Sequence, residues 1–157
     1  MRQRINQYQA MPKNNNERDY LFYLLSKQEY SYAQLKQKLV QRNYISLTEI
    51  ESLLQEFVDN NWQSDERCAE LMIKSALYKH YGLLRIKQKI IYEKGIDVSI
   101  FEKVLNALDI DWFEQAQLCY EKKYHDKAQD PKEKQKRLQY LQRQGHSLSM
   151  ALEIVSS

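Results

Sequence analysis

An internal repeat is the most constraining feature of the sequence: residues 30–58 match residues 81–109 at a constant shift of 51 positions, without a gap. Tyr30 aligns with Tyr81, and a Lys-Gln-Lys triplet follows at the same distance in both copies. The later apolar positions also align, with Ile50, Leu53, Leu54 and Phe57 over Phe101, Val104, Leu105 and Leu108. Self-similarity over about 50 residues predicts a short array of one helical unit, in which each unit packs on its neighbour.

The remaining C-terminal stretch contains a diverged third copy. Residues 144–148 align with residues 94–98 at a shift of 50. With only three Gly and two Pro in 157 residues, the composition favours helices over turns and strands. We therefore predict an all-α fold of nine helices in three tandem three-helix repeats, residues 17–62, 63–109 and 110–157, after a flexible polar tail, residues 1–16.

Residues at the predicted helix ends support this register. Each third helix is preceded by a short oxygen-bearing side chain, which can accept an N–H group of the first turn; these N-caps are Ser46, Asp97 and Ser147. Gly95 and Gly145 end the middle helices of the second and third repeats, where a left-handed residue lets the chain turn back. The first repeat has Asn43 and Tyr44 there, and Asn43 could take this conformation with the turn shifted by one residue.

The sequence indicates a cytoplasmic protein with reduced cysteines. No run of about 18 apolar residues exists, and the first residues lack the apolar core of a signal peptide. Cys68 and Cys119 lie inside helical apolar patterns with no Cys or His at ligand spacing. Buried thiols are therefore favoured over a disulfide or a metal site.

Charge is distributed according to the repeat, although the net charge is only +3. The third helices are acidic, whereas the middle helices are basic, and the candidate partner-binding residues are Lys36, Lys38, Arg42, Arg85, Lys87, Lys89, Lys132, Lys136 and Arg137. Such a row could form a basic strip for phosphates or for an acidic protein surface. Ordinary solvated helix faces are the alternative, because two residues separated by two positions, such as Lys36 and Lys38, point about 200° apart.

No pattern in the sequence predicts catalysis, a cofactor or a metal. His80, His125 and His146 fall in different repeats without partners at metal-ligand spacing. There is no Gly-rich phosphate loop and no nucleophile elbow. The twelve tyrosines interleave with Lys and Arg; their rings could stack on a base or anchor a protein interface, or they could fill gaps between helices.

Several motifs together resemble the RecX family, the bacterial regulators of the RecA recombinase. The central signature is Ser64-Asp65-Glu66-Arg67-Cys68-Ala69, then Tyr81-Gly82 with Arg85-Ile86, then Lys94-Gly95-Ile96. Residues 24–39 resemble the opening repeat of the family, and residues 143–147 resemble its closing repeat. The sequence departs from the family at Tyr44, where Gly is common, and at Cys68 and His146, where aromatic residues are common.

The resemblance implies three three-helix repeats in an elongated, curved array that binds within the groove of the RecA-DNA filament. There the protein would restrain RecA's ATP hydrolysis, strand exchange and filament growth, and so regulate DNA repair, homologous recombination and the SOS response. No catalytic residue or cofactor is needed for this action. We expect a monomer, because each repeat can bury its apolar stripe on a neighbour.

Two other functions fit the residues. A helical protein that binds single- or double-stranded DNA through the basic strip would show an affinity that falls steeply with salt. A helical adaptor for an unrelated protein is the third possibility, which a pull-down from cell extract would reveal.

Overall fold

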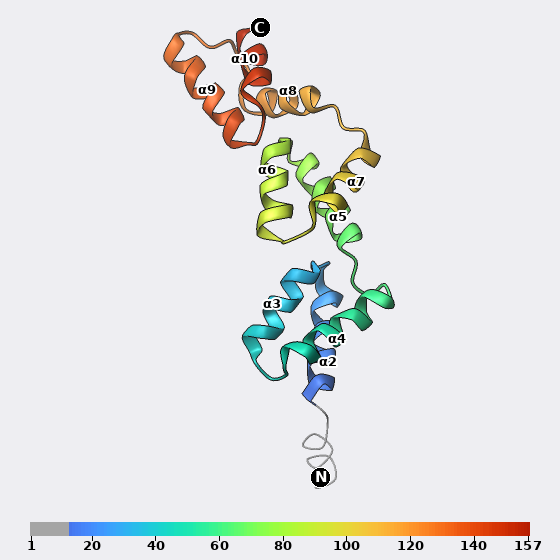
Figure 1. The fold of residues 1–157 in the computed structure, drawn as a ribbon. Coiled ribbons are helices and arrows are strands. Elements are labelled where there is room, and N and C mark those ends of the chain that lie inside the picture. Colours follow the sequence, from blue (N-terminus) through green and yellow to red (C-terminus); the bar gives the residue numbers. More distant parts are fainter. Residues whose placement is uncertain (1–12) are drawn as a thin grey trace. The chain divides into compact units, whose positions relative to one another are not determined.

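A computed structural model describes residues 13–157, and all regular structure in this range is helical (Figure 1). The helices in chain order are α2 (Lys13–Lys27), α3 (Tyr32–Arg42), α4 (Leu47–Asp59), α5 (Asp65–Tyr78), α6 (Leu83–Lys87), the π-helix η1 (Gln88–Glu93), α7 (Val98–Leu108), α8 (Trp112–Lys123), α9 (Pro131–Arg143) and α10 (Leu148–Ser156). The predicted all-α class is confirmed. Within residues 13–157, no helix combines the length and the apolar character needed to cross a membrane.

The first described helix begins at Lys13, four residues before the predicted start of the first repeat. The helix therefore includes the last residues of the segment that we predicted as a tail. The rest of that segment, residues 1–12, lies outside the described residues.

The predicted helix ends are confirmed in detail. The side chains of Ser46, Asp97 and Ser147 each accept a backbone N–H of the helix that follows. Left-handed residues end the middle helices, with φ of 69° at Gly95 and 100° at Gly145. In the first repeat Asn43 takes this role with φ of 56°, so the turn comes one residue earlier, as predicted.

The chain divides into two compact units, the first ending at Cys68 and the second running from Ala69 to Ser157. The division falls within α5, and the three predicted repeat boundaries stay a prediction. In the first unit, apolar residues of α2, α3, α4 and the turn between α3 and α4 form one core: Leu21, Leu24, Leu35, Leu39, Ile45, Ile50, Leu53, Leu54 and Phe57. Phe22, Phe57 and Trp62 pack their rings together with centroids 4.7 to 5.1 Å apart.

In the second unit, α8, α9 and α10 enclose a core of Ala116, Cys119, Leu138, Leu141, Ala151, Ile154 and Val155. Residues at the predicted apolar positions of α5 to α7, such as Ile73, Ile86, Ile90 and Phe101, are also buried. Both cysteines of the chain are buried and form no disulfide, which confirms the prediction of buried thiols.

Candidate partner-binding surface

The middle helix of the first repeat, α3, begins at a loop that is held by polar side chains. The Ser31 side chain caps α3, and the Ser31 N–H donates to Oε1 of Gln34 at 3.0 Å. The next N–H, that of Tyr32, donates to Oδ1 of Asp65 at 2.8 Å, and Gln63 Nε2 donates to the Tyr30 carbonyl at 3.1 Å. These bonds fix where α3 starts and therefore where its basic residues lie.

Two lysines of α3 keep part of their surface open. Lys36 is half-buried, and its Nζ lies 3.3 Å from Oε1 of Glu51 on α4. Lys38 is also half-buried, with its Nζ 5.6 Å from the centroid of the Tyr30 ring. Half-exposed pairs of this kind contribute little to stability, so either ammonium group can exchange its present neighbour for a partner.

Arg42, at the end of α3, is held by several groups. Its Nε donates to Oε1 of Glu17 at 2.9 Å, and the Glu17 side chain is fully buried. The guanidinium lies 3.9 Å from the centroid of the Tyr20 ring, and Tyr44 lies on it as well, at 5.0 Å. The hydrogen bond with Glu17 raises the pKa of Arg42. Arg42 therefore balances a buried carboxylate, and only part of its side chain remains accessible.

The middle helix of the second repeat begins after its N-cap, Gly82, and this start is held by backbone groups. The Gly82 N–H donates to the Gln144 carbonyl at 2.8 Å, and the Leu84 N–H donates to the Gly145 carbonyl at 3.1 Å. Arg85 Nη1 donates to Oε1 of Gln144 at 3.0 Å, and its guanidinium stacks 3.7 Å from the centroid of the Tyr81 ring. A Cβ at Gly82 would lie 2.3 Å from the Gly145 carbonyl atoms, so this contact needs glycine.

The same helix changes from α to π geometry after Lys87. The i to i−5 bond of this geometry is visible at its end, where the Lys94 N–H donates to the Lys89 carbonyl at 3.0 Å. Lys87 is half-buried and Lys89 is exposed. π-Helical turns are rare and are found often at functional sites. This turn was not predicted from the sequence, because the apolar pattern contains no signal for it: the equivalent stretch of α3 is α-helical.

The predicted basic residues of α9 fall into two groups. Lys132 and Lys136 are exposed, whereas Arg137 is only 2% exposed. Arg137 donates to the Tyr120 hydroxyl at 2.8 Å, to Oδ1 of Asp126 at 3.1 Å and to Oε1 of Glu133. These hydrogen bonds, that with Tyr120 first, raise the pKa of Arg137 above its ordinary value. Arg137 therefore joins α8, the following loop and α9, and its charge is satisfied inside the protein.

Tyrosine rings lie against the three predicted partner-binding arginines, Arg42, Arg85 and Arg137. The interleaving of Tyr with Arg and Lys was visible in the sequence, but its use in positioning guanidinium groups was not predicted. Among residues 13–157, no group of three or more His, Cys, Asp or Glu side chains could hold a metal ion. Of the nine predicted partner-binding residues, the six lysines are half-buried or exposed, and we call these six the basic row: Lys36, Lys38, Lys87, Lys89, Lys132 and Lys136.

Comparisons with known proteins agree with these features. A family model described as RecX, third three-helix domain, matches residues 109–155. Regulatory protein RecX of Haemophilus influenzae (strain PittEE) is 38% identical over 125 residues, which are 78% of this chain and 82% of the relative. Regulatory protein RecX of Haemophilus ducreyi is 41% identical over 105 residues, which are 67% of this chain and 68% of the relative.

A solved structure supports the fold independently. The crystal structure of RecX from Lactobacillus salivarius is similar with a TM-score of 0.75 at 22% identity, over 92% of this chain and 95% of that one. The sequence relatives cover most of both chains, and the motifs around Asp65, Gly82 and Gly145 form the contacts that start the middle helices. The chain therefore belongs to the RecX family of regulatory proteins.

Proposed function

We propose that the chain binds the filament that RecA forms on DNA and restrains RecA's ATP hydrolysis, strand exchange and filament growth. The observation that carries the proposal is the basic row, which repeats at equivalent positions of two middle helices, Lys36 with Lys87 and Lys38 with Lys89, in a member of the RecX family. The half-buried or exposed lysines of this row can reach an anionic partner.

The repeat supports a mode of action based on many weak contacts. A filament presents the same surface on successive subunits, and a chain with repeated cations can engage more than one of them. Linked weak contacts add as avidity, so no single lysine needs to bind strongly. Regulation of this kind needs neither a catalytic residue nor a cofactor, and it takes place where RecA and DNA are found, in the bacterial cytoplasm.

Arg42, Arg85 and Arg137 have a different place in the proposal. Their guanidinium groups are engaged by Glu17, by Tyr81 and Gln144, and by Tyr120, respectively. We assign to Arg42 and Arg85 a supporting part at the edge of the surface. Arg137 is left out of it, because a residue this deeply buried cannot reach a partner without breaking its own bonds.

The DNA-dependent ATPase of RecA tests the proposal. Increasing amounts of the full chain are added to RecA on single-stranded DNA, and inhibition is expected at or below a one-to-one ratio. A variant with Lys36→Glu and Lys87→Glu should inhibit much less. A matched variant with Lys127→Glu and Lys134→Glu removes as much positive charge outside the basic row and should inhibit like the unaltered chain. No inhibition by the unaltered chain at stoichiometric ratios would refute the proposal.

Direct binding to DNA is the second candidate. The Tyr30 ring beside Lys38 of the basic row and the Tyr81 ring against Arg85 favour it, because nucleic-acid sites combine cations with aromatic rings. In that case labelled DNA would bind without RecA, with an affinity that falls steeply as salt increases. Absence of binding to DNA alone at low salt would leave RecA as the required partner.

A further inference from the structure

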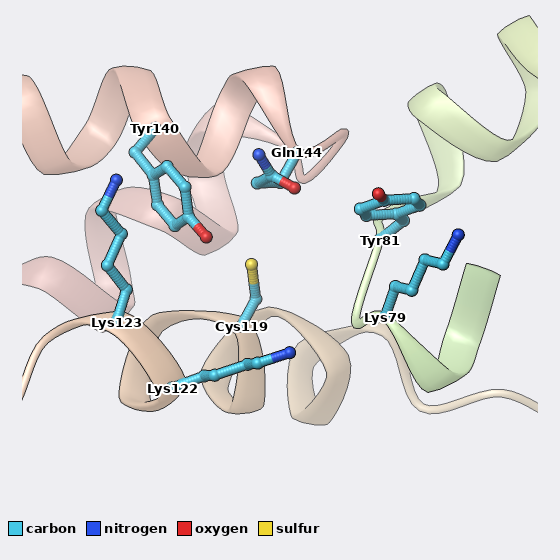
Figure 2. A pocket seen from close by; sticks show the side chains of 7 residues that line it. All are labelled: Lys79, Tyr81, Cys119, Lys122, Lys123, Tyr140 and Gln144. Carbon is cyan, nitrogen blue, oxygen red and sulfur yellow. The ribbon is translucent and has the colours of Figure 1, made fainter. Parts of the chain in front are cut away.

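The second compact unit contains a cavity of about 380 Å³ between α8, the end of α9 and the turn after α5 (Figure 2). Helix α8 contributes Cys119, Lys122 and Lys123, and α9 contributes Tyr140 and the adjoining Gln144. Lys79 and Tyr81 come from the turn after α5. Figure 2 shows the Cys119 sulfur at the centre of the floor, beneath Gln144 and beside the Tyr140 hydroxyl. The basic row does not include any of these residues.

The charge of this cavity has one sign. Every charged residue that lines it is a lysine, and none is Asp or Glu. The charges of Lys122, Arg85 and Lys123 all act on the Cys119 thiol, so Arg85 adds a fourth cation close to the cavity. Burial nevertheless raises the pKa of Cys119, which leaves the thiol neutral. Four cations thus gather around a cavity without a counter-charge from its walls, an arrangement that attracts anions.

Aromatic rings hold two of these cations in place. Lys123 Nζ lies 3.9 Å from the centroid of the Tyr140 ring, and the Arg85 guanidinium lies 3.7 Å from that of Tyr81. Arg85 also donates to Oε1 of Gln144, which leaves the amide nitrogen of Gln144 as a donor toward a ligand. The tyrosine hydroxyls add further donors. A cation held by a ring loses less side-chain entropy when it binds an anion, so the cavity is partly prepared for one.

We propose that this cavity binds a phosphate group. A phosphate has several strong acceptor oxygens and more charge than a carboxylate, which matches several cations with neutral donors between them better than a single carboxylate does. The cavity volume lies within the range of small-molecule sites, roughly 300 to 1,000 Å³, and leaves room for the group that carries the phosphate. That phosphate can belong to a free nucleotide or pyrophosphate, or to the backbone of a nucleic acid.

The position of the cavity predicts what binding does to the protein. Gln144 belongs to the turn that holds Gly82, and Tyr81 immediately precedes Gly82. A phosphate bound by Lys122, Lys123 and Gln144 on one side and by Tyr81 and Lys79 on the other would tie α8 and α9 to the start of α6. Ligand binding should therefore stabilise the second unit, by the linkage that any ligand of the folded state shows.

Isothermal titration calorimetry of the full chain without RecA tests the proposal, with sodium pyrophosphate, ATP and a short oligothymidylate as three separate probes at low ionic strength. At least one probe is expected to bind. A Lys122→Gln, Lys123→Gln variant should bind it at least about tenfold more weakly, because charge-assisted hydrogen bonds are lost. A matched Lys127→Gln, Lys134→Gln variant loses the same charge away from the cavity and should change affinity less than about twofold.

The probes distinguish the sources of the phosphate. Binding of pyrophosphate or ATP that depends on Lys122 and Lys123 assigns the site to a free phosphate compound. Binding of the oligonucleotide alone, with the same dependence, assigns it to a nucleic-acid backbone. Backbone amide chemical shifts should change at residues 119–123 and at Gln144 in either case. The proposal is overturned if no probe binds, or if both variants lose affinity equally.

Discussion

The loops before α3 and before α6 occupy equivalent positions in the repeat, yet different groups anchor them. Side chains hold the first loop, since Asp65 accepts the Tyr32 N–H and Gln63 donates to the Tyr30 carbonyl. Backbone carbonyls hold the second, since the Gln144 carbonyl accepts the Gly82 N–H. The two copies of the repeated segment are thus anchored differently, by side chains before α3 and by backbone carbonyls before α6.

The third residue of each helix explains the difference. In α3 this residue is Gln34, whose Oε1 accepts the Ser31 N–H and completes a capping box. In α6 it is Arg85, which has no acceptor, so the Gly82 N–H must find an oxygen elsewhere. It finds the Gln144 carbonyl, and the missing Cβ of Gly82 lets the two backbones approach. Because Arg85 stands where the first repeat has Gln34, the start of α6 depends on the turn after α9.

The largest loss of stability is expected when Gly82 is replaced with serine, the residue at the equivalent position of the first loop. In Gly82→Ser, the new Cβ would lie 2.3 Å from the Gly145 carbonyl carbon and oxygen, and backbone has to move. We expect the free energy of unfolding to fall by about 3 kcal/mol, the cost of overpacking a close backbone contact. Urea denaturation followed by circular dichroism measures it.

The matched change in the first loop is Ser31→Ala, which removes a cap oxygen without adding volume. It should cost about 1 kcal/mol in the same assay. Equal losses for the two variants would show that the second loop does not depend on backbone approach, contrary to the structure.

The ends of the two middle helices offer a smaller test. Asn43 has φ of 56°, whereas the aligned residue Lys94 has φ of −95°. Asn43→Ala should therefore cost about 1 kcal/mol, because alanine is disfavoured in the left-handed region, and Lys94→Ala should cost much less. Thermal unfolding of both variants makes the comparison. A larger loss at Lys94 would contradict the assignment of the left-handed turn to Asn43.

Low pH should destabilise the loop before α6 through protonation of His146. This side chain is 2% exposed, and its Nε2 lies 2.9 Å from the His80 carbonyl. Burial lowers the pKa of His146 below its ordinary value of 6.5. Below pH 6.5 the imidazole of His146 binds a proton in the unfolded chain but stays neutral in the folded chain. The free energy of unfolding therefore falls as the pH drops from 6.5 toward the lower pKa of His146 in the folded state.

A His146→Gln variant keeps a donor for the His80 carbonyl but cannot titrate. Its unfolding free energy, measured in urea between about pH 7 and pH 5, should fall less than that of the unaltered chain. Parallel curves for the two proteins would mean that His146 does not contribute to the pH dependence.

The sequence allowed the local features to be predicted, because they depend on neighbours along the chain. The helical class, the caps at Ser46, Asp97 and Ser147, and the left-handed Asn43 all follow from short-range patterns. Contacts between residues far apart in the sequence could not be predicted. Arg137 is one of several cations in α9, and it is buried because Tyr120, 17 positions earlier, receives its hydrogen bond. The π turn of η1 and the contact of Gly82 with Gly145 likewise have no local signal.

The accessibility of the predicted partner-binding residues also depends on non-local contacts. The basic positions could be counted from the repeat, but the pairing of Arg42 with buried Glu17 depends on the packing of α2 against the rest of the first unit. Periodicity places a cation on a helix, whereas only the tertiary structure decides whether its charge is used inside the protein or left for a partner.

Co-sedimentation with preformed RecA-DNA filaments tests the central claim most directly. The unaltered chain should pellet with the filaments, and Lys36→Glu and Lys87→Glu should each weaken binding about fivefold, with a loss of at least about 20-fold for the two together. The Lys127→Glu, Lys134→Glu variant should pellet like the unaltered chain, and all variants must first show the same circular dichroism and thermal unfolding. Binding of the Lys36→Glu, Lys87→Glu protein as tightly as the unaltered chain would contradict the assignment of the repeated lysines to the filament contact.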